Sequence, residues 1–581
     1  MRSVGVLLLT AFAFACVVNA FGRTPVESYI ANRQTSIDSY IANQSPIAKL
    51  GLLANIGPDG SKSSGAKAGV VIASPNTVDP NYLYSWIRDA SLTFKVIAEK
   101  VVSGEDTSLR GKIDQFFESQ KRLQQVSNPS GTVSTGGLAE PKFNIDETAF
   151  TGSWGRPQRD GPALRATTFI LYANWLIANG NITWVTRNLW PVLKLDLDYV
   201  QNNWNRSTFD LWEEINSSSF FTTAVQHRAL REGATLAQKL GQADVISGYN
   251  TQAANLLCFQ QTYKNIARGY FTANTGGGRS GIDSNTILTS IHLFDPTAGC
   301  DAATFQPCSD VALSNLKVYV DSFRSIYAIN NGFAANEAVA TGRYPEDPWY
   351  LSTFAVAEQL YDALIVWEQQ QRINVNATSL TFFRQFIPNL ATGSYAASTS
   401  TYSTLVTSVK NFADGFILIN AKYTPSDGSL AEQYTRANGS PLSARDLTWS
   451  YASALTAFAA RDGFIPPSWG ASGLTVPSSC AANPVPTVSV TFNVQATTVF
   501  GENIFLVGSV SELRNWSPDN AIPLSSASYP TWSVTVDLPG STIVEYKYIR
   551  KNGNDVVWAS DPNWRWETPA SGSATLNDNW R

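Results

Sequence analysis

Histidine, methionine and charged side chains are scarce in this sequence. Its 581 residues include two histidines, one methionine and 15% charged residues. Two histidines are too few for a multi-histidine metal site, and a hydrolytic triad would have to use His227 or His292. Because His227 lies in a helix-like run, Thr222–Leu240, we interpret it as structural. A zinc site or a Cys–His catalytic pair is therefore poorly supported, and we expect neither a metal ion nor a cofactor.

Clusters of basic residues and long apolar runs are also missing from most of the chain. The net charge is −4 and the basic residues are scattered, which argues against nucleic acid as a partner. Beyond the first twenty residues, no segment approaches the length of a membrane span. In residues 1–20, Arg2 precedes the apolar run Val4–Val18, and Val18-Asn19-Ala20 is a plausible cleavage site. We therefore predict a signal peptide at 1–20 and a secreted, extracellular monomer that does not bind membranes.

Cysteine usage agrees with secretion. One of the five cysteines lies in the predicted signal peptide, and four remain: Cys258, Cys300, Cys308 and Cys480. An even number in an oxidising compartment indicates two disulfides, for which the sequence alone allows three pairings. The sequons that we expect to carry glycans are those at Asn181, Asn205, Asn376 and Asn438.

Apolar side chains recur at helical spacing from about residue 35 to 469. One stripe joins Phe169, Tyr172 and Leu176, and others extend over Ala224–Leu240 and Trp349–Gln371. The loops between the stripes are too long for a simple bundle, whereas paired helices closed into a barrel carry such loops at one end. We predict an all-α domain over 35–469, preceded by a possible pro-segment at 21–34.

The apolar period changes from helical to alternating after a short linker, 470–486. Val488, Val490, Phe492 and Val494 alternate with polar residues, and turn residues recur between similar runs up to the C-terminus. Several short strands in so short a stretch are typical of a β-sandwich. We therefore predict a separate, small all-β sandwich domain over 487–581.

One stretch, Phe209–Phe221, places three acids among large aromatic side chains. Asp210, Glu213 and Glu214 lie between or beside Trp212 and the phenylalanines. Carboxylates usually face water, and an apolar wall or a neighbouring negative charge raises a carboxyl pKa. One of these acids is therefore a candidate general acid that stays protonated near neutral pH. The alternative is a helix start, whose first turn favours acidic residues.

A glycosidase needs two carboxyl groups with different protonation states. One donates a proton to the leaving oxygen, and the other acts as base or nucleophile. Three further stretches combine an acid with aromatic or arginine neighbours: Tyr82–Asp89, Gly342–Asp347 and Gly428–Tyr434. Each alone is compatible with an ordinary loop, but together they have the composition expected of a sugar-binding pocket.

Three blocks of sequence, 141–165, 209–221 and 442–451, are long enough to be specific. They resemble the fungal glucoamylases of glycoside hydrolase family 15, and the resemblance extends over almost the whole chain after the signal peptide. It implies an (α/α)6 barrel whose loops form a pocket that admits one chain end. It also implies hydrolysis of terminal α-1,4 bonds, and more slowly α-1,6 bonds, in starch, glycogen and malto-oligosaccharides. The product released from the non-reducing end is β-D-glucose, with inversion.

The resemblance assigns roles to individual residues. Glu213 matches the general acid and Glu432 the general base, while Asp210 and Glu214 flank the acid and are expected to keep it protonated by like-charge coupling. Arg88 matches a residue that holds the terminal glucose. The implied substrate-binding set is Tyr82, Trp86, Arg88, Asp89, Trp154, Asp210, Trp212, Glu214, Arg343, Trp349 and Trp449. The implied disulfides are Cys300–Cys308 and Cys258–Cys480.

The sequence departs from the family at one loop. Asp347 is followed directly by Pro348 and Trp349, where relatives carry a few extra residues. A shorter loop at the rim of the pocket leaves the catalytic pair intact but alters the outer substrate contacts. An α-glucan hydrolase with an altered substrate preference therefore remains an alternative.

The predicted β-sandwich resembles a starch-binding module of carbohydrate-binding family 20. The first binding site implied by the resemblance comprises Trp516 and Trp558, with Glu545, Lys547 and Asn563 nearby. Two indole rings suit stacking on adjacent glucose units. In the second implied site Tyr529 is kept, while Phe500 replaces a common Tyr. A starch-binding protein with impaired catalysis is the non-enzymatic alternative, against which the presence of both Glu213 and Glu432 argues.

Overall fold

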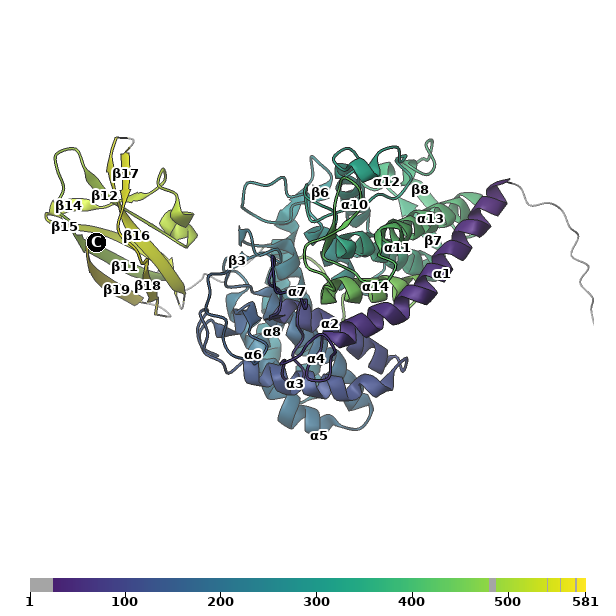
Figure 1. Ribbon diagram of the computed structural model, residues 1–581, viewed down its shortest axis with the longest axis horizontal. Coiled ribbons are helices and arrows are strands. Elements are labelled where there is room, and N and C mark those ends of the chain that lie inside the picture. Colours follow the sequence, from purple (N-terminus) through teal and green to yellow (C-terminus); the bar gives the residue numbers. More distant parts are fainter. Residues whose placement is uncertain (1–24, 480–486, 541, 554, 570–571) are drawn as a thin grey trace, which may run out of the picture.

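The protein is described by a computed structural model that covers residues 25–479, 487–540, 542–553, 555–569 and 572–581. A helical part ends near residue 479, and a β part extends from 487 to the C-terminus (Figure 1). The predicted signal peptide and residues 480–486 of the predicted linker lie outside the described residues. Helix α1, Pro25–Ala54, runs through position 34 without a break. The pro-segment at 21–34 stays a prediction.

Six of the described helices form a closed inner ring, in which each packs on the next and the last packs on the first. In ring order they are α2 (Ile87–Val102), α4 (Asp160–Ala178), α7 (Phe220–Lys239), α9 (Asn285–His292), α11 (Tyr350–Gln370) and α14 (Thr448–Arg461). Helix α11 shows why these helices lie inside, since 16 of its 21 residues are buried. A helix that is buried on nearly all sides is a core element rather than a surface one.

A second layer of helices surrounds the ring, and each member packs on one inner helix. In the order of the inner helices they are α3 (Arg110–Leu123), α6 (Trp190–Asn203), α8 (Ala243–Gln260), α10 (Asp310–Ser322), α13 (Ser400–Tyr423) and α1. Two concentric rings of six helices are an (α/α)6 barrel, so the predicted fold is confirmed. None of the helices in the described ranges combines the length and apolar character needed to cross a membrane.

The loops that precede the inner helices carry short paired strands. They are β1 (Ser85–Trp86), β2 (Lys142–Phe143), β3 (Thr208–Phe209), β4 (Asn216–Ser217), β5 (Lys264–Asn265), β6 (Tyr270–Phe271), β9 (Gln433–Tyr434) and β10 (Pro441–Leu442). Outside them lie β7 (Arg372–Val375), β8 (Gly393–Ala396) and the short helices α5 (Ile182–Trp184) and α12 (Leu380–Arg384). Most of the acid-rich stretches predicted from sequence belong to these loops, at the end of the barrel where the inner helices begin.

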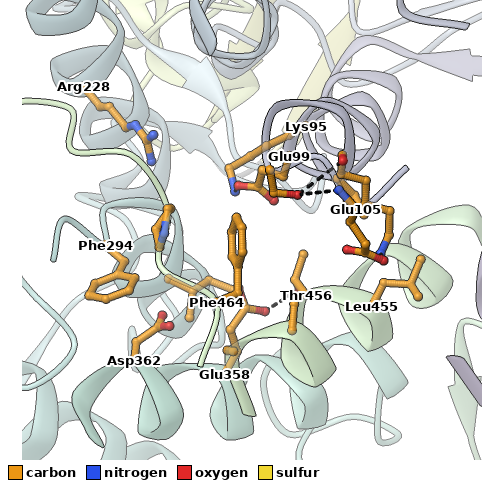
Figure 2. A pocket seen from close by; sticks show the side chains of 17 residues that line it. Lys95, Glu99, Glu105, Arg228, Phe294, Glu358, Asp362, Leu455, Thr456 and Phe464 are labelled. Carbon is orange, nitrogen blue, oxygen red and sulfur yellow. Dashed lines mark hydrogen bonds and ion pairs between the residues drawn. The ribbon is translucent and has the colours of Figure 1, made fainter. Parts of the chain in front are cut away.

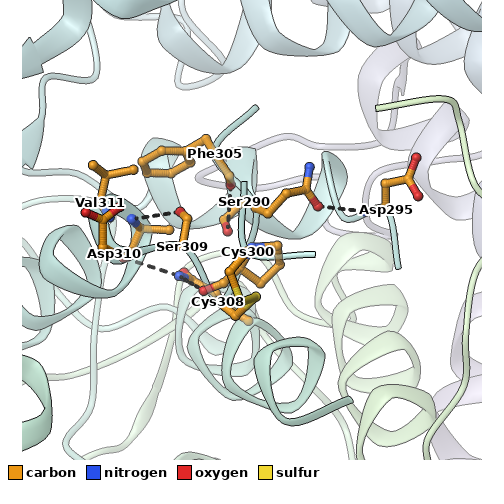
Figure 3. Close-up of a disulfide and its surroundings, with 12 residues drawn as sticks. Ser290, Asp295, Cys300, Phe305, Cys308, Ser309, Asp310 and Val311 are labelled. Atoms are coloured by element: carbon orange, nitrogen blue, oxygen red, sulfur yellow. Dashed lines mark hydrogen bonds between the residues drawn. A yellow bond between two sulfur atoms is a disulfide. The ribbon is translucent and has the colours of Figure 1, made fainter. Parts of the chain in front are cut away.

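The disulfide Cys300–Cys308, implied by the resemblance, is formed and closes a short loop between α9 and α10 (Figure 3). Cys308 is buried and Cys300 partly buried against the barrel core. Cys258 lies in α8 with its side chain buried. Its predicted partner, Cys480, lies outside the described residues, so that pairing stays a prediction.

The β part consists of two sheets around one apolar core, as the alternating pattern predicts. One sheet has the order β14-β15-β11-β19, and the other has the order β13-β12-β16-β17 with β18 paired to β16. The strands are β11 (Thr487–Gln495), β12 (Asn503–Gly508), β13 (Ile522–Pro523), β14 (Ser525–Ser528), β15 (Thr531–Pro539), β16 (Ile543–Asn552), β17 (Asp555–Trp558), β18 (Trp564–Glu567) and β19 (Gly572–Asn579). The alternating residues of β11, Val488 to Val494, point into the core with no exposed surface. The barrel touches this domain through Arg206, which donates to Thr542 Oγ1 at 3.0 Å.

Candidate active site

A cavity of about 440 Å³, a volume that includes the open solvent at its mouth, lies at the end of the barrel where the inner helices begin. It brings together residues from four separate sequence stretches. The predicted site residues that line it are Tyr82, Trp86, Arg88, Asp89, Trp212, Glu213, Arg343, Trp349, Glu432 and Trp449. The fold therefore assembles most of the predicted pocket, including both candidate catalytic acids.

Glu213 lies at the tip of the β3–β4 hairpin, before helix α7 begins at Phe220. Its backbone is left-handed, with φ +67°, a conformation that residues with a side chain rarely adopt. No acid stands in the first turn of α7, so the helix-start interpretation of this stretch is wrong. Strained backbone of this kind is concentrated at functional sites, because the surrounding structure must enforce it.

Three donors converge on one oxygen of Glu213. Its Oε1 accepts hydrogen bonds from Trp86 Nε1 at 2.6 Å and Gln158 Nε2 at 3.0 Å, and Arg88 Nη2 lies 3.5 Å away. Among the described residues, no group bonds to Oε2. The carboxyl group is thus anchored on one side and available to a substrate on the other.

Asp210 positions the loop that carries Glu213 instead of lining the cavity. It is fully buried, and its Oδ1 accepts from the backbone N–H groups of Glu214 at 3.0 Å and Ile215 at 3.2 Å. Asn274 Nδ2 donates to its other oxygen at 3.1 Å. Burial raises the pKa of Asp210, while these hydrogen bonds oppose the rise. The Asp210 carboxylate therefore accepts hydrogen bonds from backbone N–H groups of the tight turn. It stabilises the backbone of the loop that carries Glu213.

Glu432 lines the same cavity and is 4% exposed. Tyr82 donates its hydroxyl to Oε1 at 3.1 Å, and Ser443 donates to Oε2. Ser443 reaches Glu432 because the β9–β10 hairpin folds the chain back, with Glu432 N–H bonded to Ala444 O at 2.8 Å. Burial raises the pKa of Glu432, and the hydrogen bonds from Ser443 and Tyr82 limit the rise. Both oxygens therefore accept O–H donors, which favours the ionised form.

Arg88 and Asp89 form the charged inner end of the cavity. Arg88 is 5% exposed and pairs with Asp160 at 3.0 Å, and its Nη1 also donates to Gln158 at 2.9 Å. Burial raises the pKa of Asp89 to about 7, opposed by the charge of Arg88. A guanidinium and a carboxyl at the bottom of a pocket can bond several hydroxyls of one sugar ring.

Glu214 points to the rim and is bound to two arginines. Arg343 Nη1 lies 3.0 Å from it, Arg279 forms a second ion pair, and Tyr344 donates its hydroxyl at 2.5 Å. Burial acts to raise the pKa of Glu214, but Arg343, Tyr344 and Arg279 outweigh it and lower the pKa. Its charge is therefore balanced by cations at the rim. The hypothesis that Glu214 and Asp210 keep Glu213 protonated stays a prediction.

Aromatic rings form the walls. The centroid of Trp212 lies 5.4 Å from that of Trp349 and 6.1 Å from that of Trp449, and Tyr82 lies 5.4 Å from Trp86. Trp154 packs 5.9 Å from Trp86, beside the cavity but not among the residues that line it. Such flat faces bind the apolar faces of sugar rings.

The contacts of the site that were not predicted from sequence include those from Gln158, Ser443 and Arg279. Gln158 and Ser443 stand inside the blocks 141–165 and 442–451, so the specificity of those blocks was the available signal. Arg279 lies in a glycine-rich loop without any motif. A polar residue alone in a loop has no periodicity, and its partner is known only once the fold is known.

The residues implied for starch binding lie on the β domain, partly in loops. Trp558 is 39% exposed and Tyr529 is 52% exposed, whereas Lys547 is buried and its ammonium group pairs with Asp561. Asn563 Nδ2 donates to Glu545 at 3.0 Å. Trp516 ends a single helical turn, Ser511–Trp516, and is partly exposed. The second implied site includes Phe500, whose side chain is fully exposed.

Comparison with known proteins agrees with this geometry. The family model "Glycosyl hydrolases family 15" matches residues 46–459, and the model "Starch binding domain" matches residues 487–578. The chain is 60% identical to Glucoamylase-1 of Schizophyllum commune, over 95% of this chain and 97% of that protein. It is 45% identical to a glucoamylase of Neurospora crassa over the full length of both.

The fold comparison reaches the same result. The solved structure of a glycoside hydrolase family 15 glucoamylase from Hypocrea jecorina superposes with a TM-score of 0.75 at 46% identity. The match covers 94% of this chain and 100% of that one. A barrel with two carboxyl groups on one cavity, a β domain and full-length relatives together identify the chain as a member of glycosyl hydrolases family 15 with a C-terminal starch binding domain.

Proposed function

We propose that this protein is a glucan 1,4-α-glucosidase that releases β-D-glucose, with inversion, from the non-reducing ends of starch, glycogen and malto-oligosaccharides. The observation that supports it best is that Glu213, which is partly buried, and Glu432, which is buried, line one cavity together with Arg88 and Asp89, and we take this buried charged pair as the closed end of the cavity. A pocket closed at one end admits a chain terminus and excludes the middle of a chain. This is the shape that exo-hydrolysis requires.

In the proposed mechanism Glu213 is the general acid. Because Trp86 and Gln158 hold its Oε1, the proton is carried by Oε2, which faces the substrate. Oε2 protonates the glycosidic oxygen as the bond to the anomeric carbon breaks. Positive charge develops on the sugar ring, and the aromatic walls and the nearby carboxylates stabilise it.

Glu432 is the general base. Its ionised form, held by Tyr82 and Ser443, removes a proton from a water molecule that attacks the anomeric carbon from the opposite face. In inverting enzymes the two carboxyls stand roughly 6.5–9.5 Å apart, which leaves room for that water. The configuration changes from α to β in a single displacement.

The β domain supports attachment to insoluble substrate. Trp558 and Trp516 offer partly exposed indole faces, and Tyr529 offers a second exposed ring. Stacking of rings on successive glucose units holds the enzyme at the starch surface and raises the local concentration of chain ends. We infer secretion from the predicted signal peptide. We infer a monomer because the proposed mechanism uses residues of one chain.

Proton NMR of the first product tests the function. During hydrolysis of soluble starch, the anomeric signal of β-glucose should rise first, followed by mutarotation. Initial release of α-glucose, or of maltose, would contradict the inverting exo mechanism.

A shifted substrate preference is the second candidate, and the short rim loop favours it. Gly342 and Pro348 form a β-bridge, so the turn between them carries only five residues, from Arg343 to Asp347. The ratio of kcat/KM on maltoheptaose to that on maltose measures the outer contacts. A ratio near one would support weak outer subsites in this enzyme.

A further inference from the structure

A second cavity lies at the opposite end of the barrel from the candidate active site. Its volume is about 620 Å³, including open solvent at the mouth, and its lining comes from the later turns of α2 and α14 and the middle of α11 (Figure 2). Arg88, Trp349 and Trp449 of the active site stand at the N-terminal ends of these same helices. Asp362 lies thirteen residues after Trp349, which is roughly 20 Å along a helix axis. The two cavities are therefore separate.

The charged residues at the edges of this cavity are already paired. Lys95 is bound to Glu99 at 2.6 Å, and Lys100 to Glu105 at 2.5 Å. Arg228 is bound to Glu232 at 3.3 Å and also donates to the carbonyl oxygen of His292 at 2.6 Å. These three cations are thus each offset by a carboxylate of their own.

Two acids on α11 are left without a compensating cation in contact. Glu358 is 8% exposed, and its bonded partner is the hydroxyl of Thr456 at 2.5 Å. Asp362 is 4% exposed, and among the described residues its carboxyl group has no hydrogen-bond or ion-pair partner. In Figure 2 both side chains rise from α11 toward the open space below Lys95 and Glu99.

A buried carboxyl group without a partner is costly in an enclosed space. Burial raises the pKa of Glu358 to about 7, and burial together with the charge of Glu358 raises the pKa of Asp362 well above its usual value. Glu358 and Asp362 are four residues apart, so they share one face of the helix. A ligand that supplies positive charge and N–H donors at this face would remove the free-energy cost of burying the carboxylates of Glu358 and Asp362.

The remaining walls are apolar. Ile291 and Phe294 stand on one side, and Leu455 and Phe464 on the other. Phe464 and Lys95 are only partly buried, and the exposed Ser103 lies at the mouth, so the cavity is open to solvent. A ligand for this space needs an apolar body together with a charged head, which a hydrated metal ion or a sugar lacks.

We propose that this cavity, between α2, α11 and α14, is a binding site for a small organic ammonium ion, whose charged head contacts Asp362 and Glu358 while its apolar body packs against Phe294 and Phe464. The site is independent of the proposed hydrolase activity, because no residue of the catalytic cavity contributes to it.

The test is titration calorimetry at neutral pH with cyclohexylammonium chloride as the probe and cyclohexanol as the uncharged analogue. We expect the wild type to bind one equivalent of the ammonium ion and to ignore cyclohexanol. Asp362→Asn and Glu358→Gln should each weaken binding at least about tenfold, because each removes one charge-assisted contact. Glu105→Gln, at the solvent edge, is the matched control and should bind as the wild type does.

Thermal melting and starch hydrolysis provide the folding controls. Both amide variants keep the shape of the side chain and remove an unfavourable buried acid, so they should melt at or above the wild-type temperature and keep wild-type turnover. Three results would overturn the proposal: no saturable binding by the wild type, equal binding of cyclohexanol, or ammonium binding that survives in both amide variants. The last result would place the probe elsewhere, for example in the catalytic cavity.

Discussion

Replacement of Ser443 by alanine tests how the proposed base is kept ionised. The Ser443 hydroxyl donates to Glu432 Oε2, and Glu432 is almost fully buried. A hydrogen bond to a charged group contributes about 1.5–3 kcal/mol. In the variant this stabilisation of the carboxylate is lost, and water that enters the space restores part of it.

The sign of the effect follows from the role of the residue. Burial already raises the pKa of Glu432, and the Ser443 bond lowers it, so its removal raises the pKa further. A base works only when it is ionised, so the acid limb of the kcat/KM profile should move to higher pH. At a fixed pH on that limb, about 1.4 kcal/mol of lost stabilisation corresponds to roughly a tenfold fall in activity. On the plateau, where Glu432 is ionised in both enzymes, activity should be nearly unchanged.

The assay is the initial rate of glucose release from maltose across the pH range, for the wild type, Ser443→Ala and a matched control. Ser429→Ala serves as the control, since the Ser429 hydroxyl donates to the exposed Asp427 at 2.7 Å and not to Glu432. An unchanged acid limb in Ser443→Ala would refute the argument that this bond sets the ionisation of the base. A uniform loss at all pH values would show that the serine acts on geometry instead.

Three further changes test other parts of the proposal. Glu432→Gln should lower kcat by about 10²–10⁴-fold, the contribution of a positioned general base, while adsorption to granular starch is unchanged; wild-type turnover would remove it as base. Asp160→Asn should lower the free energy of unfolding, measured in denaturant, by about 3 kcal/mol, since it leaves the buried Arg88 without its closest carboxylate; no change would mean that the other partners of Arg88 suffice. The double change Trp516→Ala and Trp558→Ala should weaken adsorption to granular starch at least about tenfold but leave hydrolysis of maltose unaffected, and wild-type adsorption would place the binding surface elsewhere.

Periodicity alone predicted the division of the chain into a helical and a β part. Two patterns show this, the helical stripe that ends at Leu176 and the alternation from Val488 to Val494. In both, the apolar residues are buried in the fold, so their spacing indicates the type of secondary structure. Boundaries were less accurate. The stripe predicted to start at Ala224 begins at Phe220, because the extended residue Ser219, not the apolar pattern, determines where α7 starts.

The proposed catalytic pair could not be derived from local pattern. Glu213 and Glu432 are far apart in the sequence, and nothing in either loop indicates that the other faces it. The resemblance to a family supplied that link. The contacts that distinguish the two acids, from Gln158 and Ser443, depend on how the hairpins fold back and were found only in the structure.

The division of labour that we propose between Glu213 and Glu432 rests on their different hydrogen bonds. A general acid must present one oxygen to the substrate, and Glu213 does so because its donors all converge on Oε1. A general base must remain ionised inside a protein, and Glu432 is helped by an O–H donor on each oxygen. The left-handed backbone of Glu213 is therefore best understood as the cost of turning one oxygen toward Trp86 and the other toward the cavity.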